Sequence, residues 1–215
     1  MLFRSEHSSN VFVVSSVIDE LAHKAGIDPV IFWLRLVGDQ KHVQVREDFR
    51  FDASRLKHVI ETAAKRASWG TPLPEGRGRG FAASYNQGIW VAEVADVTVR
   101  KDRLRIDRIS CVIDCGLVIN PQAAVNQVEG GIVDGLAAAL YGKITVKDGV
   151  VQERNFNNYR FARMDDMPLI DVHFVDSKDS PRGLGEGPLA PVAPAITNAI
   201  FAATGKRIRE LPIRL

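Results

Sequence analysis

The stretch that most constrains the fold is a helix signal interrupted by glycines, in the run PQAAVNQVEGGIVDGLAAALYG that follows Asn120. Asn120 is a strong N-cap, Pro121 suits the first turn, and Gly142 ends the run, which predicts a helix as far as Leu140. Glycine inside a helix costs about 1 kcal/mol relative to alanine, and this helix contains more than one. Close approach of another backbone, or of a rigid ligand, would offset that cost.

The side chains on the glycine-bearing face of this helix leave both explanations open. Gly131, Gly135 and Ala138 or Ala139 lie on one stripe, and Gln127 lies one turn before Gly131 on the same side. The Gln127 amide could donate and accept hydrogen bonds to a heterocycle. The alternative is tight packing of the helix on a sheet, with Gln127 in solvent.

A second glycine-rich segment lies at the end of the chain, in PRGLGEGPLAPVAPAITNAIFAATGKRIRELPIRL. Glu186 stands among glycines that permit a tight turn and close approach to a ligand, ahead of a helical run predicted over residues 188–204 and ended by Gly205. A carboxylate at a helix entrance can be a buried base beside an anionic or metal-oxo group. The alternative is that Glu186 is only a helix cap.

The order of the elements predicts an α+β fold in which a mixed sheet packs against helices, not a regular parallel βαβ array. We expect a helical segment over residues 1–70 and an α+β domain over residues 71–215. The first helix is expected from a cap at Asn10 or a nearby serine to Ala25, with an inward apolar face made of Val11, Val14, Val17, Ile18, Leu21 and Ala22. The other expected elements are helices at 29–38 and 52–68, a loop at 40–51, strands within 80–100, 104–114 and 169–175, and a hairpin at 144–152.

Composition excludes several classes of function. The net charge of +2 is small and the basic residues are scattered, so neither nucleic acid nor a membrane surface is indicated as a partner. No signal peptide or membrane span is recognisable, which favours a cytoplasmic protein. Cys111 and Cys115 are too few to ligate an iron–sulfur cluster or a four-ligand zinc site, and the histidines lack metal-ligand spacing.

Three long stretches carry a family resemblance: DCGLVINPQAAVNQVEGGIVDGLAAALYG, NFNNYRFARMDDMPLIDVHFVDS and GLGEGPLAPVAPAITNAIFAATGKRIRELPI. They strongly resemble the large, molybdenum-binding subunit of the xanthine dehydrogenase/aldehyde oxidase family, and most of all its isoquinoline 1-oxidoreductase β-subunit branch. NVFVVSSVIDELAHKAGIDPVIFWLRL and the GRGRGFA connector look like the same branch, in collinear order. The resemblance implies a C-terminal part of a molybdopterin-binding domain.

The family pattern assigns roles to four residues. Glu186 matches the glutamate that acts as catalytic base beside molybdenum, where a molybdenum-bound hydroxide attacks an N-heterocycle or aldehyde carbon and hydride passes to a sulfido ligand. Gln127 matches a glutamine that contacts the pterin cofactor, and Gly185 matches a glycine that lets the loop approach the metal site. Arg4 matches the arginine of a loop facing the molybdenum centre, although the family loop contains glycine and residues 5–9 here do not.

The resemblance also implies partners, because the family subunit is several times longer than this chain. We expect the chain to need the earlier part of a molybdenum subunit, to hold no molybdopterin alone, and to pass electrons to a separate iron–sulfur subunit. Three origins fit: an expressed portion, one part of a split subunit, or the product of a truncated gene. The alternative to a catalytic part is a non-catalytic remnant or assembly module, and exposed apolar surface predicts self-association.

Overall fold

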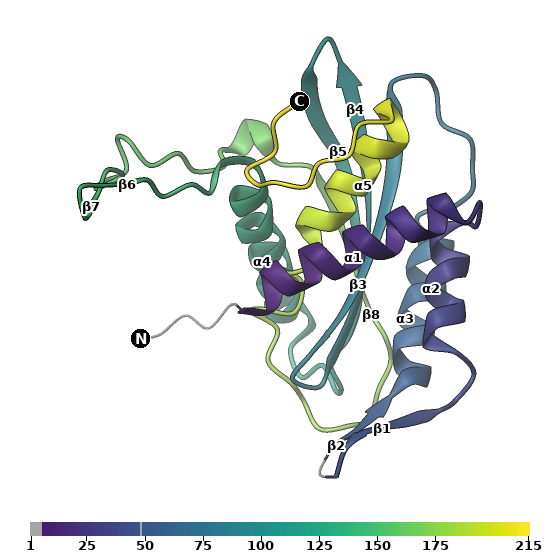
Figure 1. The fold of residues 1–215 in the computed structure, drawn as a ribbon. Helices are drawn as coiled ribbons and strands as arrows, with labels where there is room; N and C mark the ends of the chain where they lie inside the picture. Colours follow the sequence, from purple (N-terminus) through teal and green to yellow (C-terminus); the bar gives the residue numbers. More distant parts are fainter. Residues whose placement is uncertain (1–5, 48) are drawn as a thin grey trace.

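The computed structural model describes residues 6–47 and 49–215 as a four-stranded sheet with helices on both faces (Figure 1). The helices are α1 (Glu6–Lys24), α2 (Pro29–Val37), α3 (Ala53–Arg66), α4 (Pro121–Tyr141) and α5 (Val192–Thr204), with a short 3-10 turn η1 (Met164–Asp166). The strands are β1 (His42–Arg46), β2 (Phe49–Asp52), β3 (Arg77–Asn86), β4 (Ile89–Arg100), β5 (Arg103–Asp114), β6 (Val146–Lys147), β7 (Val150–Val151) and β8 (Leu169–Phe174).

The main sheet has the strand order β3-β4-β5-β8. The first three strands are antiparallel neighbours, and β8 joins β5 in parallel. Lys101 and Asp102 form the predicted turn between β4 and β5, with φ angles of 47° and 58° that suit a two-residue hairpin. The mixed sheet and the helices around it confirm the predicted α+β class.

Side chains along each strand point alternately to the two faces of the sheet, and the buried ones form two clusters, one on each face. Helices α2 and α3 cover one face, and α4 and α5 cover the other (Figure 1). Helix α5 lies directly on β3, because a Cβ at Gly80 would be 2.1 Å from the Ala199 nitrogen and 2.2 Å from the Ala195 carbonyl oxygen. Glycine in β3 therefore sets how closely the last helix approaches the sheet, and with it the position of the loop that precedes this helix.

The inward face predicted for α1 is partly wrong. Val14, Val17 and Leu21 are 51%, 48% and 49% exposed, whereas Ser15 and Asp19 are buried. Arg207, in the tail after α5, donates a hydrogen bond to the Asp19 carboxylate, and this contact turns the polar side of α1 inward. Burial raises the pKa of Asp19, and the hydrogen bond from Arg207 opposes that shift. The helix also begins at Glu6, so Asn10 is not its cap.

The loop predicted over residues 40–51 is wrong as well, because this segment forms the antiparallel β1–β2 hairpin. Phe49 and Phe51 of β2 both lie against the Tyr85 ring of β3, with ring centroids 5.8 and 5.1 Å apart. These contacts with a distant strand support a hairpin whose charged sequence gives a weak strand signal. Asp52, at the end of the hairpin, caps α3, because its side chain accepts hydrogen bonds from the N–H groups of Ser54 and Arg55.

Candidate functional site

The loop that carries Glu186 is fixed at its start by the residues that follow β5. The Arg182 N–H donates to the Cys115 carbonyl over 2.9 Å. Gly116, with φ of 76°, lies against the same loop, and a Cβ there would be 2.3 Å from the carbonyl oxygen of Ser180. A side chain at position 116 would therefore push the loop away from the sheet.

An arginine from the opposite face of the sheet ties this region together. Arg55 of α3 donates to both oxygens of buried Asp114, at the end of β5, and to Asp179 over 2.7 Å. Its guanidinium carbon also lies 3.9 Å from the centre of the Trp90 ring. Hydrogen bonding to Asp114 raises the pKa of Arg55. Helix α3, the end of β5 and the start of the Glu186 loop are thus held as one unit.

The second half of the loop lies on the glycines of α4. A Cβ at Gly131 would be 2.8 Å from Pro188 Cγ and 3.0 Å from the Gly185 carbonyl oxygen. A Cβ at Gly135 would be 2.6 Å from the Leu189 carbonyl oxygen. The close approach that offsets these helix-interior glycines is therefore made by another backbone, which is the loop around Glu186.

Glu186 itself is exposed, and among residues 6–47 and 49–215 its carboxylate has no hydrogen-bond or ion-pair partner. The helix predicted from Pro188 begins instead at Val192, and its N-cap position is Pro191, which makes no side-chain cap bond. Residues 187–191 form turns instead of the predicted helix. Glu186 lies in the turn ahead of α5, and the interpretation of Glu186 as a cap is wrong.

Gln127 is exposed on α4 and lines a shallow groove of about 310 Å³. Leu184, which lies two residues before Glu186 in the loop, lines the same groove, together with Leu117 and Ile119 from the segment after β5. Leu117 is 50% exposed and Ile119 is 79% exposed. The structure therefore places Gln127 and the Glu186 loop beside one apolar depression.

One residue near Glu186 was missed by the sequence analysis. His7, in the first turn of α1, has an Nε2 atom that is buried and makes no hydrogen bond to any residue that the structure describes. Burial lowers the pKa of His7, and the negative charge of Glu186 opposes that shift. The two side chains are far apart in sequence, so no local pattern could have paired them. Arg4, predicted to face the metal centre, lies outside the described residues.

Comparison with known proteins identifies the family and the fold of the chain. Residues 30–168 match the molybdopterin cofactor-binding domain family. The chain belongs to this family. The match includes β1 to β5 and the whole of α4 with Gln127, and it ends before the Glu186 loop.

Relatives of this molybdopterin-binding domain extend the likeness over nearly the whole chain. It is 33% identical over 94% of its length to the membrane-bound aldehyde dehydrogenase [pyrroloquinoline-quinone] of Gluconacetobacter polyoxogenes, and covers 27% of that protein. It is 31% identical over 94% of its length to isoquinoline 1-oxidoreductase subunit beta of Brevundimonas diminuta, and covers 25% of that protein. The predicted resemblance is confirmed, and the chain spans about a quarter of these relatives' length.

A solved structure shares the fold of the molybdopterin-binding domain. The aldehyde oxidoreductase of Desulfovibrio gigas superposes with a TM-score of 0.67 at 14% identity, over 95% of this chain and 40% of that one. In the described part of the domain, no helix is long and apolar enough to cross a membrane. The same residues contain no cluster of three histidine, cysteine or acidic side chains able to hold a metal ion.

Proposed function

We propose that this chain forms one wall of the active site of a molybdenum hydroxylase that oxidises aldehydes or N-heterocycles. The observation that carries the proposal is the position of Glu186, whose loop is held by α4 and the end of β5 while its carboxylate stays exposed and unbonded within the described chain. A polar group held in place without an internal partner is available to an external one. The names of two relatives, an aldehyde dehydrogenase and an isoquinoline oxidoreductase, supply the substrate classes.

The residues around the loop fit a flat, hydrogen-bonding cofactor. A Cβ at Gly183 or Gly185 would meet nothing within 4 Å in the described chain, so internal packing does not explain these glycines. Backbone approach to an external group would explain them. Gln127 is exposed at the edge of an apolar groove, where its amide can both donate and accept hydrogen bonds. Molybdopterin has this heterocyclic chemistry.

Each residue then has a distinct task. Glu186 accepts a proton at a carboxylate oxygen, as a general base placed beside the reacting group. Gln127 holds and orients the pterin heterocycle, and Gly185 allows the cofactor to approach the loop backbone. Arg4 is proposed to contribute a positive charge on the same side. When bound, the molybdenum centre supplies the oxygen-transfer and two-electron chemistry.

The proposed enzyme needs other polypeptide parts. Electrons must leave through a separate iron–sulfur subunit, because Cys111 and Cys115 are the chain's only cysteines and both are buried. We propose that the earlier part of a molybdenum subunit completes the cofactor site and that the chain alone retains no cofactor. We also propose a cytoplasmic location. The proposed substrate is a small aldehyde or N-heterocycle.

The test compares the chain alone with the chain co-expressed with a polypeptide that supplies the rest of a molybdenum subunit. Molybdenum and oxidised pterin should appear only in the assembled protein. There, Glu186→Gln should lower turnover at least about a hundredfold while molybdenum content is kept, because general base catalysis contributes that much. Glu210→Gln, at an exposed glutamate in the C-terminal tail, is the matched control. Full activity in Glu186→Gln would refute the catalytic role and favour a non-catalytic module.

A second variant tests the role of Gly185 in cofactor binding. Gly185 has no positive φ and no neighbour within 4 Å of an added Cβ, so Gly185→Ala should leave the melting temperature of the chain unchanged. In the assembled protein the added methyl group should lower molybdenum content, measured by elemental analysis. Unchanged molybdenum content would show that this side of the loop does not face the cofactor.

A further inference from the structure

Strand β5 is covered by a neighbouring strand along only half of its outer edge. β8 pairs with residues 108–113 of β5, from Arg108 opposite Leu169 to Ile113 opposite Phe174. Residues 103–107 have no strand on that side, and within the described residues no loop or turn forms a main-chain hydrogen bond with them. Unpaired N–H and C=O groups along a strand edge can bind a further strand.

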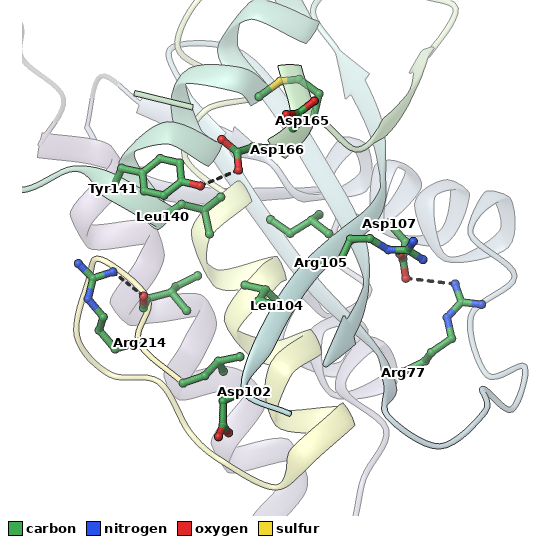
Figure 2. Close-up of a pocket in the computed structure, with 14 residues that line it drawn as sticks. Arg77, Asp102, Leu104, Arg105, Asp107, Leu140, Tyr141, Asp165, Asp166 and Arg214 are labelled. Carbon is green, nitrogen blue, oxygen red and sulfur yellow. Dashed lines mark hydrogen bonds and ion pairs between the residues drawn. The ribbon is translucent and has the colours of Figure 1, made fainter. Parts of the chain in front are cut away.

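A cavity of about 640 Å³ lies along this open edge (Figure 2). Leu104 and Ile106 of β5 line one wall, and Leu140 at the end of α4 and Ile213 of the C-terminal tail line the other. These side chains continue the buried cluster beneath α4 and α5. On this side of β5, an added strand would therefore meet these apolar side chains, although Asp165 and Asp166 line the cavity as well.

The other face of the sheet beside this edge is basic. A second hollow of about 370 Å³ is lined by four arginines, Arg77, Arg100, Arg103 and Arg105, and by no carboxylate. Arg77 and Arg105 share the Asp107 carboxylate, at 3.4 and 2.6 Å. Arg100 and Arg103 face each other directly across the β4–β5 ladder, and no ion pair of either is present within the described chain. Like charges directly opposite are unfavourable, so a carboxylate supplied from outside would relieve the pair.

β8 shows which kind of sequence the edge of β5 binds. Its Ile170, Val172 and Phe174 pack against the cluster beneath α4 and α5. Asp171, between them, accepts hydrogen bonds from Arg66 over 3.2 Å and from Arg108 over 3.1 Å on the other face. In the strand that already occupies half of the edge, apolar side chains thus face the cluster and one acidic residue, Asp171, meets arginines on the other face.

We infer that residues 103–107 of β5 bind an extended segment of a partner polypeptide in which apolar and acidic residues alternate. The segment adds to the sheet in line with β8, its main chain pairs with β5, its apolar side chains enter the 640 Å³ cavity, and its carboxylates meet Arg103 and Arg105. A second copy of this chain is the competing occupant, since pairing of residues 103–107 about a twofold axis sets Arg105 opposite its own counterpart but Arg103 opposite Asp107.

Amide hydrogen exchange and NMR shifts of the purified chain test this interaction without any cofactor. The probe is a short peptide that alternates valine with aspartate, and the control peptide has the same composition with all aspartates at one end. The alternating peptide should protect amides within residues 103–107 and shift them in a salt-dependent way. Equal effects of both peptides, or none, would overturn the inference, and so would protection that grows with protein concentration when no peptide is present.

Charge exchange at the arginines tests the register. Arg103→Glu combined with Arg105→Gln should weaken binding of the aspartate peptide about fivefold or more, and should favour a peptide with lysine in place of aspartate. Lys147→Gln combined with Arg154→Gln, at the exposed β6–β7 hairpin, is the control and should change neither affinity. Unchanged affinities in the arginine variant would overturn the assignment of the acidic side chains to Arg103 and Arg105.

Discussion

Replacing Gly135 by alanine tests whether α4 and the Glu186 loop approach each other as closely as the structure indicates. The added Cβ would be 2.6 Å from the Leu189 carbonyl oxygen and 2.8 Å from Val192 Cγ2. Real Cβ atoms do not come within 3.0 Å of such atoms, and the oxygen belongs to the main chain, so the loop must move. Gly130 lies in the same helix, and a Cβ added there would meet nothing within 4 Å, which makes Gly130→Ala the matched control.

The two substitutions should change the free energy of unfolding in opposite directions. Alanine is favoured over glycine in a helix interior by about 1 kcal/mol, so Gly130→Ala should raise the free energy of unfolding by up to that amount. At Gly135 the same gain is set against an overpacking cost of about 1–3 kcal/mol, so the net change should be a loss of up to about 2 kcal/mol. For a chain of this size each kcal/mol corresponds to about 2–4 °C in melting temperature.

Thermal and urea unfolding followed by circular dichroism would measure both variants. Gly131→Ala should fall between them, because its nearest contact is the Pro188 ring at 2.8 Å, and the Gly185 carbonyl oxygen is 3.0 Å away. If Gly135→Ala stabilised the chain as much as Gly130→Ala, the loop could not lie against α4 in the way described, and the position of Glu186 would lose its support.

Three further changes test other parts of the fold. Burial raises the pKa of Glu93 well above its ordinary value of 4.5, so the folded chain keeps a proton that the unfolded chain releases. The free energy of unfolding should therefore fall as pH rises above 4.5, by up to about 1.4 kcal/mol per pH unit. Glu93→Gln should abolish this fall in urea titrations. Asp28→Ala removes the cap of α2 and should cost about 1–2 kcal/mol in urea unfolding, more than Asp39→Ala at an exposed ion pair. Arg55→Ala leaves Asp114 buried without its partner and should cost about 3 kcal/mol in the same assay, and a negligible change would refute the proposed tie between α3 and the end of β5.

The elements that could be predicted from sequence are those with local signals at their ends. Asp28 with Pro29 marks the start of α2, Asn120 with Pro121 marks the start of α4, and Gly205 ends α5. In each case the capping group bonds a main-chain atom only a few residues away, so the information lies within one turn of sequence. The start of α5 lacks such a signal, because Pro191 at its N-cap position makes no side-chain cap bond and Pro188 lies in the turns ahead of the helix.

The features that could not be predicted depend on partners far along the chain. The inward face of α1 is decided by Arg207, and an apolar pattern taken alone selects Val14 and Val17 instead of Asp19. The proximity of His7 and Glu186 likewise exists only in the folded chain. The roles of Glu186 and Gln127 came from family resemblance and stay predictions, whereas their positions beside one groove come from the structure.

The glycines in and around the Glu186 loop divide into two groups. Gly131 and Gly135 are required by contacts inside the chain, because the loop backbone occupies the space of their side chains. Gly183 and Gly185 face no described atom within 4 Å of an added Cβ, so nothing inside the chain requires them. The loop therefore lies against α4, and at Gly187 against Ile89 and Val91 of β4, while its backbone at Gly183 and Gly185 is open to a second surface. The glycines of α4 therefore weaken their own helix but fix the loop, and the proposed cofactor would lie against the side on which Glu186 is exposed.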